Sequence, residues 1–367
     1  MTLRIDRLDC WVLRAPIDEP VANAFGAMTN RPAVFLRISA SDGAFGWGEV
    51  FSNFPQVGAE HRARLVSSIF APLLAGHAAD DPQALRDMLG RRTRQMAIQC
   101  GEPGPFAQIS GAVDQALWDM VARRAGVPLW KHLGGQSPRV RVYASGIGPD
   151  KVVETMLAKR AEGYRAFKLK VGFAPQRDLA NMRDARAALG EDAVIMCDAN
   201  QGWSYDDAAI ALTGMAPYHV QFCEQPMRAW NDGRLPALKK ISPIPIMADE
   251  SVFDAHDAER LIQANACQYV NIKFAKSGGM HEALKINNIC EKNSIPCMMG
   301  GMLESRLALS AFAHFAMAHD NVIFYDMDTC MIGHKEDPVT GGVRYDGFFV
   351  EPPATPGIGA DIDDRFL

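Results

Sequence analysis

The 367-residue sequence lacks several features that would assign it to a specialised class of protein. No apolar run approaches the ~20 residues that a membrane-spanning helix needs, and residues 1–15 mix charged with apolar side chains, unlike a signal peptide. The 38 basic and 43 acidic residues give a net charge of -5, without the basic stripe that binds nucleic acid or an anionic membrane. We therefore expect a cytoplasmic protein with a small-molecule substrate and neither a nucleic-acid nor a membrane partner.

Two further absences narrow the chemistry. The eight cysteines contain no CxxC pair, and several lie in apolar runs, as is typical of buried reduced thiols. No glycine-rich phosphate motif follows the first strand of the βα region, which argues against an open, doubly wound nucleotide-binding sheet.

The hydrophobic pattern divides the chain into three parts. Residues 1–130 begin with period-2 alternation at 4–13, 33–39 and 45–50 and continue with helical periodicity, which predicts an α+β domain. Residues 131–330 carry eight short apolar runs separated by helical stretches, and the first run, expected to be the first barrel strand, is 140–143. This pattern predicts an α/β domain with eight parallel strands in a closed barrel. Residues 331–367 are rich in Gly, Pro and Asp, and we expect them to return to the first domain.

Charged residues end consecutive apolar runs of the second part. They are Lys168, Lys170, Asp198, Glu224, Asp249 and Lys273. From Lys170 to Lys273 the steps are 28, 26, 25 and 24 residues, which suits one strand, one helix and two loops. The carboxyl ends of parallel strands open at one mouth of a barrel, where active sites are built. The pattern therefore predicts an active site at that mouth.

Three carboxylates in this series point to a metal ion. Asp198, Glu224 and Asp249 would converge from neighbouring strands and repel one another unless a cation lies among them. Oxygen ligands favour a hard divalent cation, Mg2+ first with Mn2+ as the alternative, and the absence of His and Cys argues against zinc. We expect Asn200 and Glu250 to contact these ligands from outside. The structural alternative is that each acid caps a helix or pairs with a surface base.

The lysines suggest proton transfer. Lys168 and Lys170 lie two apart on one strand and share a face, so their ammonium groups should disfavour each other's charge and lower a pKa toward the range where a lysine accepts a proton. Lys170 is then the candidate acid/base, and Lys168 its electrostatic partner. Lys273 ends the sixth strand, opposite the second in an eight-stranded ring, so a substrate carbon would have one amine on each side. Alternatively, these lysines are solvated strand ends. Lys276 is interpreted as a loop residue that contacts an anion.

The chain resembles the enolase superfamily and, within it, the muconate-lactonizing-enzyme subgroup. The matching segments are 46–49, 116–119, 168–170, 197–200, 224–226, 248–251, 271–273, 276–279 and 302–305. The resemblance implies a modified (β/α)7β barrel with an α+β capping domain, assembled as a homo-oligomer. It also implies abstraction of the proton α to a substrate carboxylate, with an enediolate stabilised by magnesium. By position, the three carboxylates would be the metal ligands and Lys170 and Lys273 the two acid/bases.

The reaction within this subgroup depends on the last strand. Asp326 and Asp328 resemble the Asp-x-Asp motif with which dipeptide epimerases bind a substrate ammonium group; alternatively they cap a helix or bind Arg306. The seventh strand lacks the His of mandelate-racemase-type members, which disfavours that subgroup.

We therefore predict racemisation or epimerisation of an amino-acid derivative or dipeptide. A muconate-type cycloisomerase, a syn-dehydratase of a hydroxy acid or amino hydroxy acid, and a barrel that only binds a ligand are the alternatives. Phe25, Met28, Phe54 and Met302 are the predicted walls of the substrate pocket. Residues 21–31 are interpreted as a loop of the cap, and this loop matches no specificity that we can assign.

Overall fold

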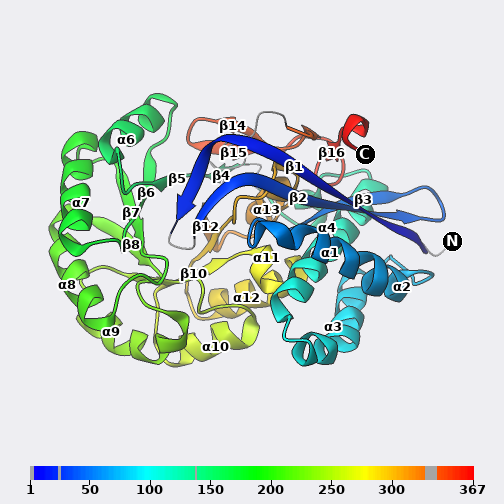
Figure 1. Ribbon diagram of the computed structural model, residues 1–367, viewed down its shortest axis with the longest axis horizontal. Helices are drawn as coiled ribbons and strands as arrows, with labels where there is room; N and C mark the ends of the chain where they lie inside the picture. Colours follow the sequence, from blue (N-terminus) through cyan, green and yellow to red (C-terminus); the bar gives the residue numbers. More distant parts are fainter. Residues whose placement is uncertain (1–3, 24–25, 137–138, 327–336) are drawn as a thin grey trace.

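The computed structural model describes residues 4–23, 26–136, 139–326 and 337–367. A barrel of parallel strands ringed by helices occupies one side of the molecule, and a cap of long antiparallel strands and helices occupies the other (Figure 1). None of the helices in these ranges is both long and apolar enough to cross a membrane.

Eight parallel strands form the barrel. They are β5 (Ala144–Ile147), β6 (Ala166–Lys170), β7 (Val194–Asp198), β8 (Val220–Glu224), β9 (Ile246–Ala248), β10 (Tyr269–Ile272), β11 (Cys297–Met299) and β12 (Val322–Tyr325). Their spatial order follows the sequence, with β5 and β12 at the two ends of the sheet. A parallel bridge between Val142 and Tyr325 links those ends, so the sheet curls into a ring.

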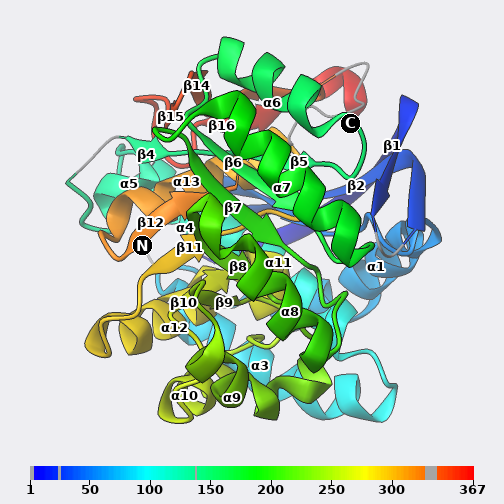
Figure 2. The ribbon, with the colours of Figure 1, turned by 90° about the vertical axis from the view of Figure 1, so that its left-hand side faces the viewer.

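Helices alternate with these strands on the outside of the ring (Figure 2). They are α6 (Val152–Ala161), α7 (Pro175–Leu189), α8 (Tyr205–Met215), α9 (Leu235–Ile241), α10 (Ala255–Gln263), α12 (Met280–Lys292) and α13 (Arg306–Ala318), with the one-turn α11 (Phe274–Ser277) before α12. This alternation gives the (β/α)7β architecture, so the prediction of a modified barrel with a cap is confirmed.

Strand alternation decides which side chains reach the barrel interior. The floor of the interior is a small apolar cluster of Tyr143, Ala166, Met196, Phe222, Met247 and Met298. Residues two positions later face the same side one layer higher, and among them are Lys168, Asp198, Glu224 and Asp249. The intervening residues, such as Leu169, pack outward against the helices. The apolar floor therefore places the charged residues at the carboxyl ends of the strands.

The cap is a three-stranded antiparallel sheet with helices on it. Its strands are β1 (Ile5–Asn23), β2 (Gly26–Ala40) and β3 (Phe45–Val50), and its helices are α1 (Ala59–Leu65), α2 (Ala71–Leu74), α3 (Pro82–Gln99) and α4 (Pro103–Arg124). Strand β3 lies directly on α4, because a Cβ atom at Gly46 or Gly48 would overlap the α4 carbonyls of Ala116 and Ala112. The two glycines therefore permit the close contact between strand and helix.

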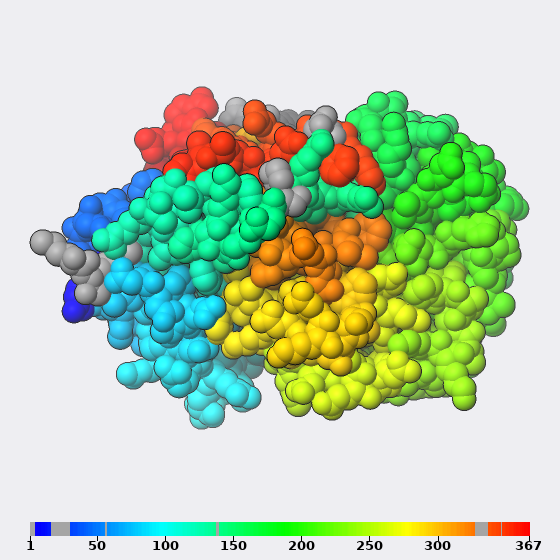
Figure 3. Space-filling view, turned by 180° about the vertical axis from the view of Figure 1, so that it is seen from behind, coloured from blue at the N-terminus to red at the C-terminus, as the bar shows by residue number. Residues whose placement is uncertain are grey.

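The C-terminal segment lies beside the N-terminal part of the chain (Figure 3). It contains the short strands β13 (Val339–Gly341), β14 (Arg344–Asp346), β15 (Phe349–Glu351) and β16 (Ala360–Ile362). Trp47 of the cap donates its indole N–H to Asp361 at 3.0 Å, and Arg123 of α4 donates to the Ala360 carbonyl at 2.7 Å. The domain boundaries at residues 130 and 330 stay predictions.

Two local predictions are wrong. The first barrel strand is β5, whereas the expected segment 140–143 contains β4 (Val140–Arg141), which pairs with β15 at the edge of the barrel. Within the cap segment 21–31, interpreted as a loop, residues 21–23 belong to β1 and residues 26–31 to β2, with Val21 opposite Met28 and Asn23 opposite Gly26. Hydrogen-bonded pairing between β1 and β2 extends both strands beyond the segments in which apolar and polar residues alternate.

Candidate active site

The charged strand ends lie side by side at one mouth of the barrel. Lys170, Asp198 and Glu224 are direct partners in the registers of β6, β7 and β8. Asp249 and Lys273 each follow at once on β9 and β10. All five predicted residues are thereby brought together at the carboxyl-terminal mouth of the barrel.

Asp198 and Glu224 form the first part of an ion-pair network. Lys170 Nζ donates to Asp198 Oδ2 at 2.7 Å, and the Asn200 backbone N–H donates to Oδ1 at 2.9 Å. Glu224 accepts from Lys168 Nζ and from Asn271 Nδ2, each at 2.6 Å and each on a different oxygen. Both carboxylates therefore have a donor on each oxygen.

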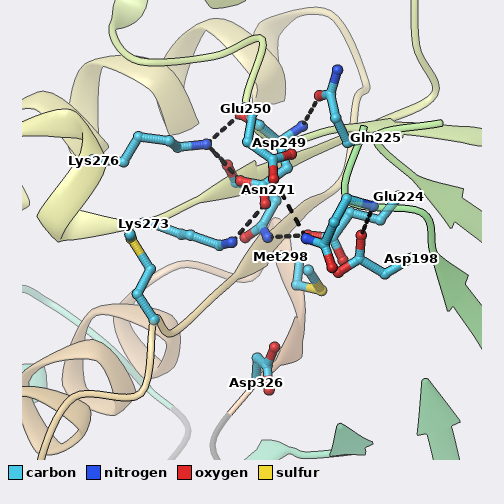
Figure 4. Close-up of polar contacts among 12 residues, drawn as sticks. Asp198, Glu224, Gln225, Asp249, Glu250, Asn271, Lys273, Lys276, Met298 and Asp326 are labelled. Atoms are coloured by element: carbon cyan, nitrogen blue, oxygen red, sulfur yellow. Dashed lines mark hydrogen bonds and ion pairs between the residues drawn. The ribbon is translucent and has the colours of Figure 1, made fainter. Parts of the chain in front are cut away.

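Asp249 lies between two lysines. Lys273 Nζ donates to its Oδ2 at 2.6 Å, and Lys276 Nζ donates to its Oδ1 at 2.7 Å. Lys273 and Lys276 reach this carboxylate from the side of the site opposite Asp198 and Glu224 (Figure 4). Lys276, interpreted as a loop residue that contacts an anion, lies in the one-turn helix α11, and the anion that its buried side chain contacts is the Asp249 carboxylate.

Burial and neighbouring charges shift the pKa values of these groups. Burial, together with the negative charge of Asp198, raises the pKa of Glu224 to about 8, although the ammonium group of Lys168 acts in the opposite direction. For Asp249, burial acts upward, but Lys273 and Lys276 hold the pKa well below its usual range. For Lys168, burial acts downward, but Glu224 and other neighbours raise the pKa well above its usual value. For Lys168 the neighbouring carboxylates therefore outweigh the effect of burial.

The lysines differ in their access to solvent. The side chains of Lys170 and Lys273 are 24% and 14% exposed, whereas that of Lys168 is 2% exposed. Lys170 contacts Asp198 at the end of β7, and Lys273 contacts Asp249 just after β9. The two amines therefore lie at opposite ends of the carboxylate row. A substrate above this row would have one accessible amine on each side.

Asp326, which follows β12, completes the ring. Its Oδ2 accepts from Ser145 Oγ and from Lys168 Nζ, both at 3.3 Å. Its Oδ1 is buried and accepts no hydrogen bond from any residue of the described ranges. The carboxylate therefore keeps an oxygen available for a cationic group of a ligand.

The carboxylates fit a hard divalent cation by their chemistry. They are oxygen donors from three neighbouring strands and are almost fully buried. Within the part of the chain that the structure covers, no three His, Cys, Asp or Glu side chains are arranged as metal ligands. The carboxylates of Asp198, Glu224 and Asp249 instead accept hydrogen bonds from lysines. Burial is the main cause of the raised pKa of Glu224, and the charges of Asp198 and Asp249 add to it. A cation shared by Asp198, Glu224 and Asp249 would stabilise the charged forms of the three buried carboxylates.

The two residues expected outside the metal ligands lie in this network. Asn200 Oδ1 accepts from Lys170 Nζ at 2.8 Å, and Asn200 Nδ2 donates to Glu250 Oε1 at 3.4 Å. Burial and the charge of Asp249 raise the pKa of Glu250 to about 7. Their roles toward a metal stay predictions.

The predicted pocket walls are only partly described. Phe54 and Met302 are half-buried, on the cap and after β11 respectively. Phe25 and Asp328 lie outside the described residues, as does the side chain of Met28. The alternative that the Asp pair binds Arg306 is not supported for Asp326, since Arg306 pairs with Asp337 at 2.7 Å.

Two contacts were missed in the sequence. Asn271 lies two residues before Lys273, so its inward direction could have been read from strand alternation, and it donates to Glu224. Ser145 was missed because the first barrel strand was placed too early.

Comparison with known proteins covers nearly the whole chain. Residues 151–366 match the family described as "Enolase C-terminal domain-like", and residues 9–134 match "Mandelate racemase / muconate lactonizing enzyme, N-terminal domain". The chain is 34% identical to a D-Ala-D/L-Ala epimerase of Cytophaga hutchinsonii, over 99% of this chain and 97% of the relative. It is 31% identical to an L-Ala-D/L-Glu epimerase of Clostridium acetobutylicum, over 95% and 96% of the two chains.

Solved structures show the same relationship. The crystal structure of the Cytophaga hutchinsonii dipeptide epimerase, complexed with Mg and the dipeptide D-Ala-L-Val, superposes with a TM-score of 0.89 at 31% identity. The alignment covers 100% of this chain and 98% of that one. A substrate-liganded L-Ala-D/L-Glu epimerase from Bacillus subtilis gives a TM-score of 0.87 at 28% identity, over 97% and 98% of the two chains.

Proposed function

Because this chain belongs to the enolase superfamily, in the mandelate racemase and muconate lactonizing enzyme group, we propose that it is an isomerase that epimerises a dipeptide at a carbon next to a carboxylate. The observation that carries the proposal is the pair of accessible amines, Lys170 and Lys273, at the two ends of one row of buried carboxylates. The names of the relatives, which are dipeptide epimerases, support the choice of substrate class.

The two lysines would transfer the proton between opposite faces of the carbon. The neutral amine of Lys170 takes the α-proton from one face, and the electrons of the C–H bond move into an enediolate of the substrate carboxylate. The ammonium of Lys273 then delivers a proton to the other face, and the reverse reaction exchanges the two roles. One epimer is thereby converted to the other without net consumption of protons.

Asp198, Glu224 and Asp249 would hold the divalent cation, Mg2+. When bound, the cation polarises the substrate carboxylate and so makes the α-proton more acidic. Lys168 fixes the orientation of Glu224 through the contact at 2.6 Å, and its buried position keeps it away from the substrate carbon. Asn271 orients the other oxygen of Glu224.

Asp326 favours a substrate with a free amino group. Its buried Oδ1 lacks a partner among the described residues, and an ammonium group would supply one. A muconate-type cycloisomerase acts on a dianion, to which this carboxylate would be repulsive. We therefore place epimerisation of a dipeptide ahead of cycloisomerisation and dehydration.

The test is a mass-shift screen in deuterated water with Mg2+. Dipeptides, N-acylamino acids and cyclic amino acids are incubated with the protein, and deuterium at the α-carbon is measured. We expect incorporation into dipeptides with inversion of one centre. Loss of water or ring closure without exchange into the recovered substrate would instead identify a dehydratase or cycloisomerase.

A further inference from the structure

The loop between β11 and α13, residues 300–305, contains a backbone conformation that its sequence does not favour. Leu303 has a φ of +68°, in the left-handed region that L-residues with a side chain rarely adopt. Such a conformation persists when the surrounding structure holds it. The question is therefore which groups hold Leu303.

Two buried side chains of the cap converge on this residue. Asn53 Nδ2 donates to the Leu303 carbonyl at 2.8 Å and to the Met302 carbonyl at 3.1 Å. The guanidinium of Arg31 donates to the same Leu303 carbonyl. Arg31 and Asn53 are 2% and 3% exposed. The donors come from residues about 250 to 270 positions earlier in the chain, so only docking of the cap on the barrel brings them to Leu303.

A third cap residue fixes the far end of the loop. Ser305 is the N-cap of α13, and its backbone N–H and hydroxyl donate to the Glu49 carboxylate at 3.0 and 2.5 Å. The Glu49 carboxylate thus accepts from the N-terminus of α13, where backbone N–H groups have no partner within the helix. The loop is thus anchored to the cap at Leu303 and at Ser305.

The near end of the loop packs on the candidate active site. Gly300 donates its N–H to the Ile272 carbonyl at 2.8 Å, and a Cβ atom at Gly300 would lie 2.8 Å from Cε of Lys273. A Cβ atom at Gly301 would lie 3.1 Å from the carbonyl of Asp326. Gly300 and Gly301 therefore lie against the side chain of Lys273 and the backbone of Asp326, and a shift of the loop would change both contacts.

We propose that Arg31 and Asn53 are positioning residues, which hold Leu303 in its left-handed conformation and so set the 300–305 loop against Lys273 and Asp326. The kinetic consequence rests on the proposed function, whereas the conformational consequence does not. Through these contacts, docking of the cap determines the geometry on the Lys273 side of the substrate. Glycine at position 303 adopts a positive φ without strain, so Leu303→Gly should reduce the need for the cap donors.

The experiment compares Asn53→Ala, Leu303→Gly and the double variant. Asn321→Ala is the matched control, because the Asn321 side chain also donates to a backbone carbonyl, that of Ile295, at 3.0 Å. Asn321 directly precedes β12, so this contact lies at the end of the barrel opposite the candidate active site. Amide hydrogen exchange of residues 300–308 reports the loop without any substrate. Values of kcat and KM for a dipeptide report the site.

Loss of a buried hydrogen bond predicts that Asn53→Ala lowers kcat/KM about tenfold and speeds amide exchange at Met302 and Ser305 by a similar factor. Leu303→Gly in the same background should restore kcat/KM to within about threefold of Leu303→Gly alone. Asn321→Ala should leave both readouts at the wild-type values, although it lowers the melting temperature. If Asn53→Ala does not fold, Asn53→Ser replaces it in all arms.

Unchanged exchange at Met302 and Ser305 in Asn53→Ala would overturn the proposal. So would a double variant that keeps the full loss, or an equal loss in Asn321→Ala, since either result means that only general stability is affected. If the wild-type protein turns over no dipeptide, the proposed function fails, and the exchange measurement alone decides whether Arg31 and Asn53 position the loop.

Discussion

Substitution of Asp326 by Asn tests the substrate class most specifically. Asp326 Oδ2 is held by Ser145 and Lys168, both of which are donors, so an amide at this position must keep its oxygen there. The amide NH2 group then takes the place of Oδ1 and presents a donor to the substrate ammonium. Removal of the buried charged partner of a cation costs about 2–5 kcal/mol. At ~1.4 kcal/mol per factor of ten, this corresponds to roughly 30- to 4000-fold in kcat/KM.

The lower part of this range is expected, because Asp326 is 8% exposed and water can partly replace it. We expect a loss of about 100-fold in kcat/KM for a dipeptide. An N-acetylamino acid with the same C-terminal residue has no ammonium group, so its kcat/KM should change by less than about threefold. Both substrates are measured by α-deuterium incorporation. Equal losses for the two substrates would refute the assignment of Asp326 to ammonium binding.

Three further predictions concern charge and stability. Lys276→Met removes one of the two ammonium groups that contact the buried Asp249. We therefore expect the free energy of unfolding, measured by urea titration in metal-free buffer, to fall by about 3 kcal/mol. A loss below about 1 kcal/mol would mean that this ion pair contributes little to stability. Mg2+ at about 100 times its Kd should stabilise the wild-type protein by ~2.7 kcal/mol in a thermal melt. Asp249→Asn should abolish this stabilisation. Equal stabilisation of the two proteins would mean that the cation binds elsewhere. His314 is buried between the Trp130 N–H and the Ile358 carbonyl, and burial lowers its pKa from 6.5 to about 3. Below pH 6.5 the unfolded chain therefore binds a proton that the folded chain does not bind. Between pH 6.5 and 4.5 the wild-type protein should lose about 2 kcal/mol of unfolding free energy relative to His314→Asn, and parallel pH profiles would show that His314 is not the cause.

Strand alternation explains why so much of the site could be predicted. Each candidate metal ligand or lysine lies at the end of a short apolar run. Neighbouring parallel strands bring these ends together, regardless of the sequence of the helices between them. Asp198 and Glu224 were predicted to be neighbours on this basis, and they are direct register partners. The barrel with a cap is confirmed for the same reason, because the repeat of strand and helix fixes the architecture.

Tertiary contacts explain what the sequence did not reveal. The raised pKa of Lys168 depends on Glu224 and Asp326, whose carboxylates approach from other strands. The contacts of Arg31 and Asn53 with Leu303 join segments about 250 to 270 residues apart, and no local pattern marks them. The roles of the pocket residues, the metal ligands and the lysines stay predictions until they are tested by substitution.

The central claim is that Lys170 and Lys273 serve opposite faces of one substrate carbon. Its most direct test is α-proton exchange in deuterated water by Lys170→Ala and Lys273→Ala, each given the two epimers of a dipeptide separately. We predict that each variant loses epimerisation but still exchanges the α-proton of one epimer, and that the two variants retain opposite epimers. Exchange of the same epimer by both variants, or full epimerisation by either one, would contradict the two-base account.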